Sequence, residues 1–461
     1  MTTETVHQAA LESFTEDASG YRGDAERVFT PATVEEVQRI VRSAVEQNIP
    51  LTASGAGTGL TGARVPHGGW VVSLREFRRL EIEPGMAHAG AGVLLQDVQL
   101  AAQRTRQFFG PNPTESAASI GGIINTNASG SRSFKYGSVR RHVLGLEAVF
   151  MDGSVRRFRR GNRVDFPFQP VRRPATRKNS AGYYLQPDLE WIDLLCGSEG
   201  TLAIVTEADL RLIPEPPAIL SAIVFFHTDG EALDAVDAWR DLSGLRLLEY
   251  FDVNSIELVR HQNQGIPPGA KGGLLVEQEL TGDDDPELDR WITRLAAAHA
   301  YENESWFGMT QGDRDRFQRF RHSLATNTLD RVRRNGFNKY GTDFAVPVDR
   351  WREFVRYYRQ QCEREMPGRY VMYGHIGDAN AHVNLFPETQ AQVEICDRLI
   401  TDFGRYAIEL GGTVAAEHGI GKIKTHLLRA MYQPAEIEAM LDVKRKLDPK
   451  GLLGHGNIFG E

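Results

Sequence analysis

The chain has 461 residues, about three times the length of a typical ~150-residue domain, so we expect two or three domains. Hydrophobic residues make up 41% of the chain and charged residues 25%, a balance that excludes wholesale disorder. The formal net charge of −8 gives no support for a nucleic-acid-binding protein or for one held to anionic lipid.

The cysteines and the N-terminal residues indicate where in the cell the protein is expected to be. Cys196, Cys362 and Cys396 are far apart and no CxxC pair occurs, which excludes an iron–sulfur cluster or thiolate zinc site of the chain's own. So sparse a set also argues against a secreted disulfide scaffold. Residues 1–7 are polar, and no run of about 18 apolar residues occurs. We therefore expect no signal peptide, no membrane span and a soluble, cytoplasmic protein.

Short alternating elements are predicted in the first half of the chain. The patterns indicate a helix over 34–47 and strands over 50–53, 70–74, 143–150 and 202–212. The proline-rich segment 213–217 then predicts a link between domains. The segment 156–178 is rich in arginine and is expected to be a solvated surface insertion, with an anion-binding patch as the alternative.

The second half predicts a domain that mixes helices and strands. A strand is expected over 218–226, followed by helices over 230–242, 286–299, 351–365 and 391–410. Further strands are expected over 274–279 and 370–374. Four or five strands among these helices favour an α+β second domain.

Glycine is concentrated in three clusters, at 55–69, 121–130 and 197–200. The first contains Gly57-x-Gly59-x-x-Gly62, a formal match to the dinucleotide fingerprint, which requires a helix to begin at its last glycines. Pro66 and the glycines at 68–69 disfavour that helix, so a nest of backbone N–H groups around a diphosphate is the better interpretation. Each cluster alone is consistent with structural glycines at turns, whereas three in order favour one large ligand.

A histidine constellation lies in the second half. His375, His382 and Asn384 fall within ten residues, and Glu417-His418 follows about 35 positions later. If 381–386 is a strand, His382 and Asn384 share one face and the apolar residues between them share the other. Two histidines and a carboxylate form the ligand set of an open divalent-metal site, with hydrogen-bonded structural histidines as the alternative.

The three clusters together resemble a known family. The stretches LTASGAGTGLTG, SIGGIINTNASGSRSFKYGSVRRHVLGLEAV and GSEGTLAIVTEADLRL are similar to the vanillyl-alcohol oxidase/p-cresol methylhydroxylase (PCMH)-type FAD-binding family. Within it they resemble the branch of D-lactate dehydrogenase, D-2-hydroxyglutarate dehydrogenase and the glycolate oxidase flavin subunit. The resemblance runs from about Thr30 to Phe459. It implies an α+β fold with a two-subdomain PCMH-type FAD-binding domain over 1–217 and an α+β cap over 218–430, with an antiparallel sheet covered by helices. Residues 431–461 would return to the FAD domain.

The resemblance also implies the FAD-binding residues. Covalently flavinylated relatives carry a histidine in or near the first loop; none stands between Leu51 and Pro66, so noncovalent FAD is expected. The implied FAD-binding positions are Gly55, Ala56, Gly57, Thr58, Gly59, Leu60, Thr61, Gly62, Pro111, Thr114, Gly121, Gly122, Asn125, Asn127, Ala128, Gly130, Tyr136, Gly137, Glu199, Gly200, Val205 and Asn457.

In the cap, the resemblance implies a divalent metal on His375, His382 and Glu417, with Zn²⁺ favoured over Mn²⁺ or Fe²⁺. It implies His418 as the catalytic base. We expect Glu417 and His418, as neighbours in an extended segment, to point in opposite directions. The implied substrate-binding residues are Arg321, Lys339 and Asn384, with Arg316 and Arg319 as alternatives to Arg321. Position 325 is alanine where the family pattern has threonine, which leaves the substrate side chain open.

The implied activity is that of an FAD-dependent dehydrogenase that oxidises a small D-2-hydroxy acid, of the D-lactate, glycolate or D-2-hydroxyglutarate type. Hydride would pass to flavin N5 and electrons would leave to a quinone, an electron-transfer flavoprotein, a cytochrome or a partner subunit; a homodimer is one assembly consistent with it. Two alternatives stay open. One is a flavin subunit of a larger electron-transfer complex, and the other is a metal-dependent hydrolase without flavin.

Overall fold

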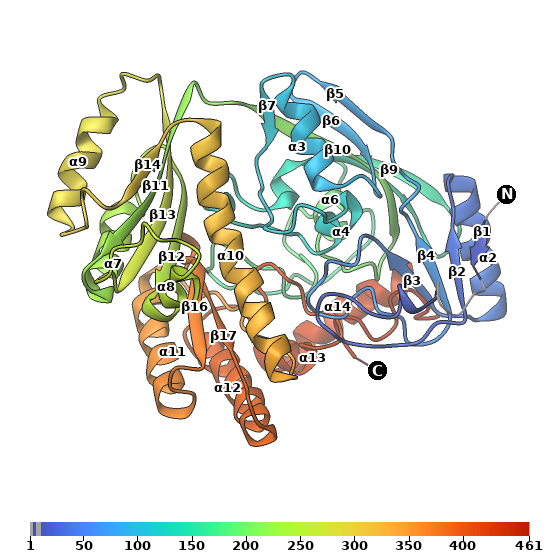
Figure 1. Cartoon of the computed structure of the whole chain (residues 1–461). Coiled ribbons are helices and arrows are strands. Elements are labelled where there is room, and N and C mark those ends of the chain that lie inside the picture. Colours follow the sequence, from blue (N-terminus) through green and yellow to red (C-terminus); the bar gives the residue numbers. More distant parts are fainter. Residues whose placement is uncertain (1–2, 6–10, 461) are drawn as a thin grey trace.

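The computed structural model of the chain describes residues 3–5 and 11–460. Most of the polar stretch 1–7, on which the expectation of no signal peptide rests, lies outside the described residues, as does Glu461. Two sheets and their helices form one half of the molecule, and a third sheet with long helices forms the other (Figure 1). Among the described helices, none combines the length and apolar composition that a membrane crossing needs.

The first sheet has the strand order β1-β2-β4-β3, with bounds Thr3–Thr5, Arg27–Thr30, Trp70–Ser73 and Leu51–Ser54. Its strands β2, β4 and β3 are parallel, and helix α2 (Val34–Gln47) joins β2 to β3. Thr33 caps the start of this helix, because its side chain accepts a hydrogen bond from the Glu36 N–H. The helix ends at Asn48, which has a left-handed backbone conformation. Helix α2 and strands β3 and β4 confirm the sequence prediction, whereas β2 was not predicted.

The second sheet is antiparallel, and the second and third glycine clusters lie in its connections, whereas the first cluster connects β3 to β4 of the first sheet. Its order is β5-β6-β10-β8-β9, with bounds Leu80–Glu83, Met86–Gly90, Ile204–Pro214, Val143–Val149 and Val155–Arg159. The short strand β7 (Gln107–Phe109) pairs with the end of β10. Because β7 gives residues 212–214 a partner, β10 continues into the segment expected to be a link. The helical pieces of this half are α3 (Leu95–Gln103), α4 (Ile120–Asn125), α5 (Ser133–Tyr136), η1 (Val139–His142) and α6 (Trp191–Leu195).

The third sheet, which we call the cap sheet, has seven antiparallel strands, where four or five were expected. Its order is β14-β11-β13-β12-β16-β17-β15, with bounds Trp306–Gly308, Ala218–Phe226, Gly272–Leu280, Leu245–Asp252, Tyr370–His375, Asn380–Leu385 and Tyr340–Gly341. The edge strands β14 and β15 have three and two residues, too short to produce an alternating pattern that a sequence reading can detect.

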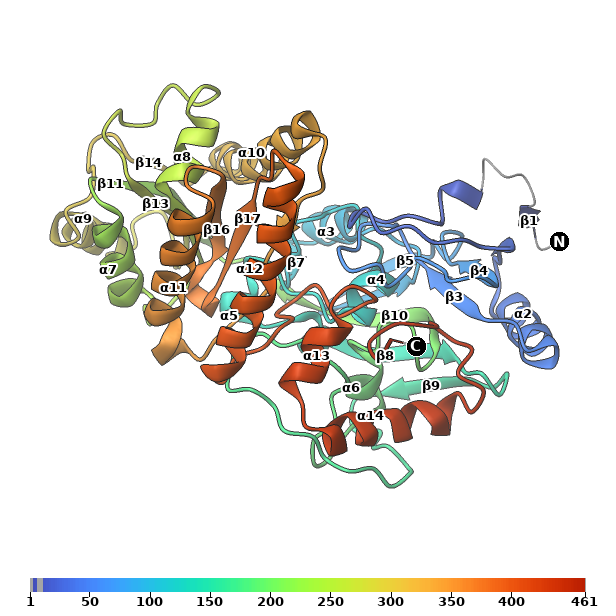
Figure 2. The same cartoon turned by 90° about the horizontal axis from the view of Figure 1, so that it is seen from below.

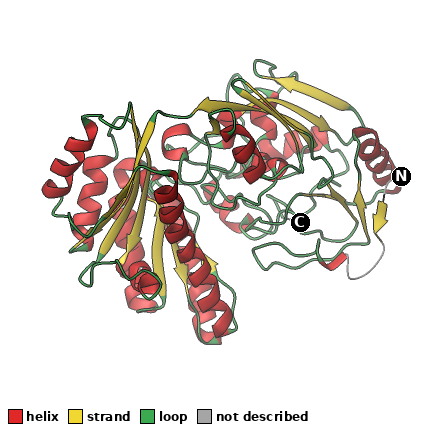
Figure 3. Cartoon of the chain, turned by 45° about the horizontal axis from the view of Figure 1, so that its top comes forward, coloured by secondary structure: helices red, strands yellow, loops and turns green. Residues whose placement is uncertain are grey.

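Helices cover both faces of the cap sheet (Figure 3). One face packs on α7 (Asp229–Trp239), α9 (Glu287–Ala297), α11 (Trp351–Glu365) and α12 (Gln390–Glu409), and the other on α8 (Val253–Arg260) and α10 (Gln311–Asn335). Successive residues of strand β11 point to opposite faces of the sheet. Val224 packs in the core formed with α7, α9, α11 and α12, whereas Phe225 packs with Phe317 and Phe320 of α10. The turns η2 (Val348–Arg350) and η3 (Ile376–Asp378) complete the cap.

The last part of the chain returns to the first half. Helices α13 (Thr425–Met431) and α14 (Pro434–Leu447) lie beside α6 and β9 (Figure 2). Beyond them, the Leu51 N–H donates to Leu452 O at 2.8 Å, and the Gly454 N–H donates to Leu51 O at 2.8 Å. Strand β3 is therefore completed by residues near the end of the chain. The domain limits expected from the sequence stay predictions.

Most arginines of the arginine-rich segment are exposed, as expected, namely Arg157, Arg159, Arg163, Arg172 and Arg177. Two of its cations have partners elsewhere in the chain. Arg160 donates to Val143 O and to Asp193, both at 2.8 Å. Lys178, at the end of the segment, is only 2% exposed. The partners of these cations come from distant parts of the chain, so the local composition could not reveal them.

Candidate functional site

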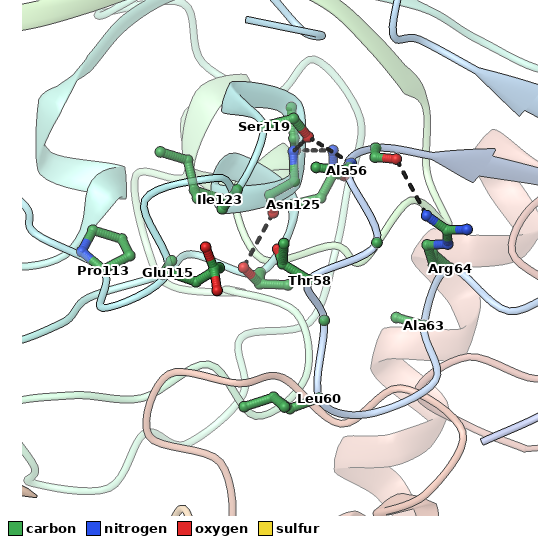
Figure 4. A pocket seen from close by; sticks show the side chains of 18 of the residues that line it. Ala56, Thr58, Leu60, Ala63, Arg64, Pro113, Glu115, Ser119, Ile123 and Asn125 are labelled. Atoms are coloured by element: carbon green, nitrogen blue, oxygen red, sulfur yellow. Dashed lines mark hydrogen bonds between the residues drawn. The ribbon is translucent and has the colours of Figure 1, made fainter. Parts of the chain in front are cut away.

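A cavity lies where the glycine loops meet the cap (Figure 4). Ala56, Thr58 and Leu60 lie along the first loop. Ser119, the N-cap of α4, and Asn125, at the other end of α4, face them. The implied FAD-binding positions on its wall are Gly55, Ala56, Gly57, Thr58, Gly59, Leu60, Thr114, Gly121, Gly122, Asn125, Ala128, Gly130, Glu199 and Gly200. Eight others lie off the wall, namely Thr61, Gly62, Pro111, Asn127, Tyr136, Gly137, Val205 and Asn457. Flavin contact by any of these residues stays a prediction.

The first loop fits a diphosphate. It opens no helix, since the segment from 55 to 94 is non-helical, so the dinucleotide-fingerprint interpretation does not apply. Gly57 and Gly62 have φ of 84° and 74°, which turn the backbone in the way a nest requires. Within the described part of the chain, the N–H groups of residues 57–60 donate to no protein acceptor. Four consecutive free donors on a cavity wall are suited to binding an anion.

The loops approach each other too closely for side chains. A Cβ atom on Gly55 would lie 2.3 Å from Ser119 Oγ, and one on Gly130 would lie 1.9 Å from Asn112 O. Gly130 also has φ of 84°, where an L side chain is strained. Gly55 therefore allows the first loop to approach the start of α4, and Gly130 allows the end of the second cluster to approach the segment at Asn112.

Glu199 ties the third cluster to the cap. Its carboxylate accepts the N–H groups of Ile420 at 2.7 Å and Gly421 at 2.6 Å. Burial raises the pKa of Glu199 to about 7, against the lowering effect of these two hydrogen bonds. Asn457 connects the C-terminal segment to the first loop and to the third cluster, because its Nδ2 donates to Ala63 O at 2.7 Å and to Glu199 O at 3.1 Å.

The structure brings His375, His382 and Glu417 together, with one ligand atom from each within 4.8 Å of the others. His375 ends β16, His382 lies on β17, and these strands are adjacent. Glu417 Oε1 lies 2.9 Å from His375 Nε2 and 3.4 Å from His382 Nε2. On β17, Val383 and Leu385 belong to the cap core, whereas Asn384 shares the face of His382, as the alternation predicts.

Partners behind the two histidines orient them. Glu249, fully buried on β12, binds His375 Nδ1, and His382 Nδ1 lies 2.8 Å from Thr342 O. Both Nε2 atoms therefore point towards Glu417, so each ring can ligate a divalent cation through Nε2 once that nitrogen is deprotonated. Burial lowers the pKa of His375, but the carboxylates of Glu249 and Glu417 outweigh it and raise the pKa to about 9, so binding of a cation would release a proton. The donor set fits such an ion. Sequence analysis missed Glu249, whose signal was a lone acid in the apolar strand Leu247–Phe251.

The two oxygens of Glu417 have different partners. Oε2 accepts the Gly130 N–H at 2.8 Å and the Lys178 ammonium at 3.0 Å, whereas Oε1 faces the histidines. Burial alone would raise the pKa of Glu417, but the neighbouring His375 and Lys178 hold it well below its usual range. Glu417 is therefore an ionised carboxylate with one oxygen directed into the ligand set.

His418 corrects the expectation that neighbours point apart. Residues 416–418 form a bend, and His418 Nε2 lies 3.9 Å from Glu417 Oε1, so the two side chains converge. Asp343 holds this bend, because its Oδ2 accepts the His418 N–H and the Lys424 ammonium, both at 2.9 Å. Burial lowers the pKa of His418 to about 4, so its imidazole is neutral near pH 7.

The implied substrate-binding residues lie beside this cluster. Arg321 Nε donates to Glu249 Oε2 at 2.5 Å, and its guanidinium stacks 5.0 Å from the Tyr373 ring. Asn384 and Lys339 flank Gly341, where a Cβ would lie 3.1 Å from Asn384 Oδ1 and 3.5 Å from Lys339 Cε. Burial lowers the pKa of Lys339. Substrate contact by these residues stays a prediction.

The alternatives to Arg321 point elsewhere. Arg316 stacks 4.6 Å from the Trp306 ring, and Arg319 is exposed. Neither is buried beside the histidines, whereas Arg321 shares Glu249 with His375. The geometry therefore favours Arg321 of the three arginines.

Comparison with known proteins matches two family models. Residues 25–159 match the FAD binding domain, and residues 215–458 match the C-terminal domain of FAD linked oxidases. The chain is 32% identical over 441 residues to a D-lactate dehydrogenase of Archaeoglobus fulgidus, covering 94% of this chain and 90% of the relative. It is 27% identical to glycolate oxidase subunit GlcD of Bacillus subtilis over 464 residues, covering 96% and 90%. It is 29% identical to D-2-hydroxyglutarate dehydrogenase of Xanthomonas citri pv. viticola over 445 residues, covering 93% and 88%.

Solved structures agree on the architecture. An alkyldihydroxyacetonephosphate synthase superposes with a TM-score of 0.70 at 16% identity, covering 98% of this chain and 81% of the other. At this identity the likeness concerns the fold alone.

Proposed function

Because the chain belongs to the FAD-linked oxidase family, whose members are FAD-linked oxidoreductases, we propose that it is a dehydrogenase that oxidises a D-2-hydroxy acid to the 2-keto acid. One observation carries this proposal. The cavity wall that contains the three glycine clusters also contains Glu417 and His418 of the cap. A carboxylate of the candidate metal site and a neutral imidazole thus face the candidate flavin site. Relatives named as D-lactate and D-2-hydroxyglutarate dehydrogenases support the substrate class.

The residues divide the work as follows. His418 has no hydrogen bond on its ring nitrogens within the described residues, and its lowered pKa keeps it neutral, so it is available to accept the hydroxyl proton. His375, His382 and Glu417 would hold a divalent cation, with zinc suited to this donor set. When bound, the flavin supplies a two-electron acceptor and the cation supplies a Lewis acid that favours the ionised hydroxyl.

The substrate carboxylate has cationic partners nearby. Arg321 presents its remaining guanidinium N–H groups beside the metal cluster, and Lys339 adds a second positive charge. Asn384, on the same face of β17 as His382, offers an amide to the substrate. FAD is held noncovalently in this proposal, and an external acceptor takes the electrons.

The test uses the purified protein. Absorbance near about 450 nm would show bound flavin and would exclude a flavin-free metal hydrolase. The protein is then mixed without oxygen with D- and L-lactate, glycolate and D- and L-2-hydroxyglutarate in a stopped-flow instrument. Bleaching of the flavin by a D enantiomer, with turnover when an artificial electron acceptor is added, is expected. A flavin that no D-2-hydroxy acid or glycolate reduces would contradict the proposal.

A further inference from the structure

Lys178 is a buried cation at the junction between the FAD-binding half and the cap. Its side chain is 1% exposed, and its Nζ lies 3.0 Å from Glu417 Oε2, 3.1 Å from Gly130 O and 3.6 Å from Asp378 Oδ2. An ammonium so fully buried needs several partners, and here they come from both halves of the molecule. One of them is a carboxylate of the candidate metal site.

The contacts divide the oxygens of Glu417 into two roles. Oε2 receives two donors, the Gly130 N–H and the Lys178 ammonium, both from the FAD-binding half. Oε1 faces His375 Nε2 and His382 Nε2 of the cap. A carboxylate with both oxygens free can bind a cation in bidentate fashion, and this one has a single oxygen available.

We propose that Lys178 is a positioning residue that keeps Glu417 a one-oxygen ligand and so leaves a coordination position open for the substrate. The inference rests on the proposed function, in which the cap holds a divalent cation. Catalytic zinc sites characteristically combine three protein ligands with an open position. Without Lys178, Oε2 keeps only the Gly130 N–H as a partner, so it can turn more readily towards the cation and occupy that position.

Two effects of removing Lys178 on metal affinity oppose each other. The ammonium holds Glu417 ionised and in place, which favours metal binding, but its own positive charge repels the cation. Metal retention is therefore a weak discriminator, and access of a second chelating molecule to the bound cation is the sharper one. The discriminating quantity is the affinity for a small chelating dicarboxylate.

The experiment compares Lys178→Met, which removes the charge at similar length, with Lys178→Arg, which keeps it. Lys135→Met is the matched control, because Lys135 forms an ion pair with Glu279 across the same junction, at 2.5 Å, without touching Glu417. Each protein is loaded with FAD and Zn²⁺, the contents are measured, and oxalate is titrated by calorimetry. Only heat that disappears after metal removal is counted.

We expect FAD and zinc contents to be unchanged in all four proteins. The Kd for oxalate should rise about 10-fold in Lys178→Met, equivalent to about 1.4 kcal/mol, because Glu417 Oε2 would then compete with oxalate for the open position. It should rise less in Lys178→Arg and remain as in the wild type in Lys135→Met. A purely architectural lysine would change thermal stability without changing oxalate affinity.

Two results would overturn the proposal: wild-type oxalate affinity in Lys178→Met at saturating Zn²⁺, or failure of both Lys178 variants to fold. If only Lys178→Met fails to fold, Lys178→Gln replaces it with the same expectation. A wild-type protein that takes up no zinc would instead refute the metal site of the proposed function. The two failures are therefore distinguishable.

Discussion

Glu249 is the single side chain on which both the metal cluster and the candidate substrate arginine depend. Its Oε1 binds His375 and its Oε2 binds Arg321 at 2.5 Å, and it is fully buried. Glu249→Gln preserves the shape of the side chain and removes its charge. Arg321, itself 8% exposed, would then be a buried cation without its carboxylate.

The expected cost follows from this burial. Breaking a buried ion pair by removing one partner costs about 3–5 kcal/mol, because the remaining charge stays desolvated. A domain of about 150–250 residues loses about 2–4 °C of Tm per kcal/mol. The unfolding transition that includes the cap should therefore fall by roughly 6–20 °C. Zinc should also be held more weakly, because His375 loses its charged hydrogen-bond partner.

Differential scanning calorimetry at fixed FAD and zinc concentrations measures the transition, since both ligands shift Tm by mass action. Glu257→Gln is the control: Glu257 is half-exposed on α8 and pairs with Arg260 at 2.8 Å, so its loss should shift Tm by less than about 2 °C. If Glu249→Gln lowers Tm by less than about 3 °C, the pair with Arg321 is not the stabilising contact inferred from its burial.

Four further predictions follow from the site. Acid precipitation should release all the flavin into the supernatant, and yellow colour in the pellet would indicate a covalent link. His418→Ala should retain FAD and zinc yet slow flavin reduction by about 10²–10⁴ in stopped flow, whereas Glu417→Gln should lose metal and regain some activity in excess Zn²⁺; the reverse pattern would exchange their roles. Arg321→Lys should lower kcat/KM by more than about threefold, because a planar fork becomes a point charge; steady-state kinetics showing less would remove Arg321 from substrate binding. Burial lowers the pKa of His142 to about 4, below its unfolded value, so its stabilising contribution is present above pH about 6.5 and is lost as the pH falls towards 4. His142→Gln should flatten the pH dependence of urea unfolding in that window, and an unchanged slope would contradict this assignment.

Local sequence patterns predicted the helices and strands whose own residues alternate between apolar and polar with helical or strand periodicity. Helices α2 and α11 match the expected bounds, because each has an amphipathic repeat. The alternation on β17 correctly placed His382 and Asn384 on one face. The cluster of His375, His382 and Glu417 could be anticipated because its residues lie in two short, glycine-flanked motifs.

The orienting residues had no such signal. Glu249 meets His375 across 126 positions, and Lys178 meets Glu417 across 239 positions. The partner of a buried charge cannot be identified from local sequence, so Glu249 in the apolar run 247–251 and a lysine after eight arginines gave no indication of what they contact. The bend at 416–418 was missed for a similar reason, since Asp343 and Lys424 impose it from outside the segment.

The return of the chain to β3 has a consequence for biosynthesis. Asn457 bonds Ala63 in the first glycine loop, and 394 positions separate them. At ribosomal speeds of about 5–20 residues per second, β3 and its loop wait roughly 20–80 s for that partner to be made. Flavin capture is therefore expected to wait until the residues around Asn457 have been made, and the exposed edge of β3 needs protection from other nascent chains in the interval.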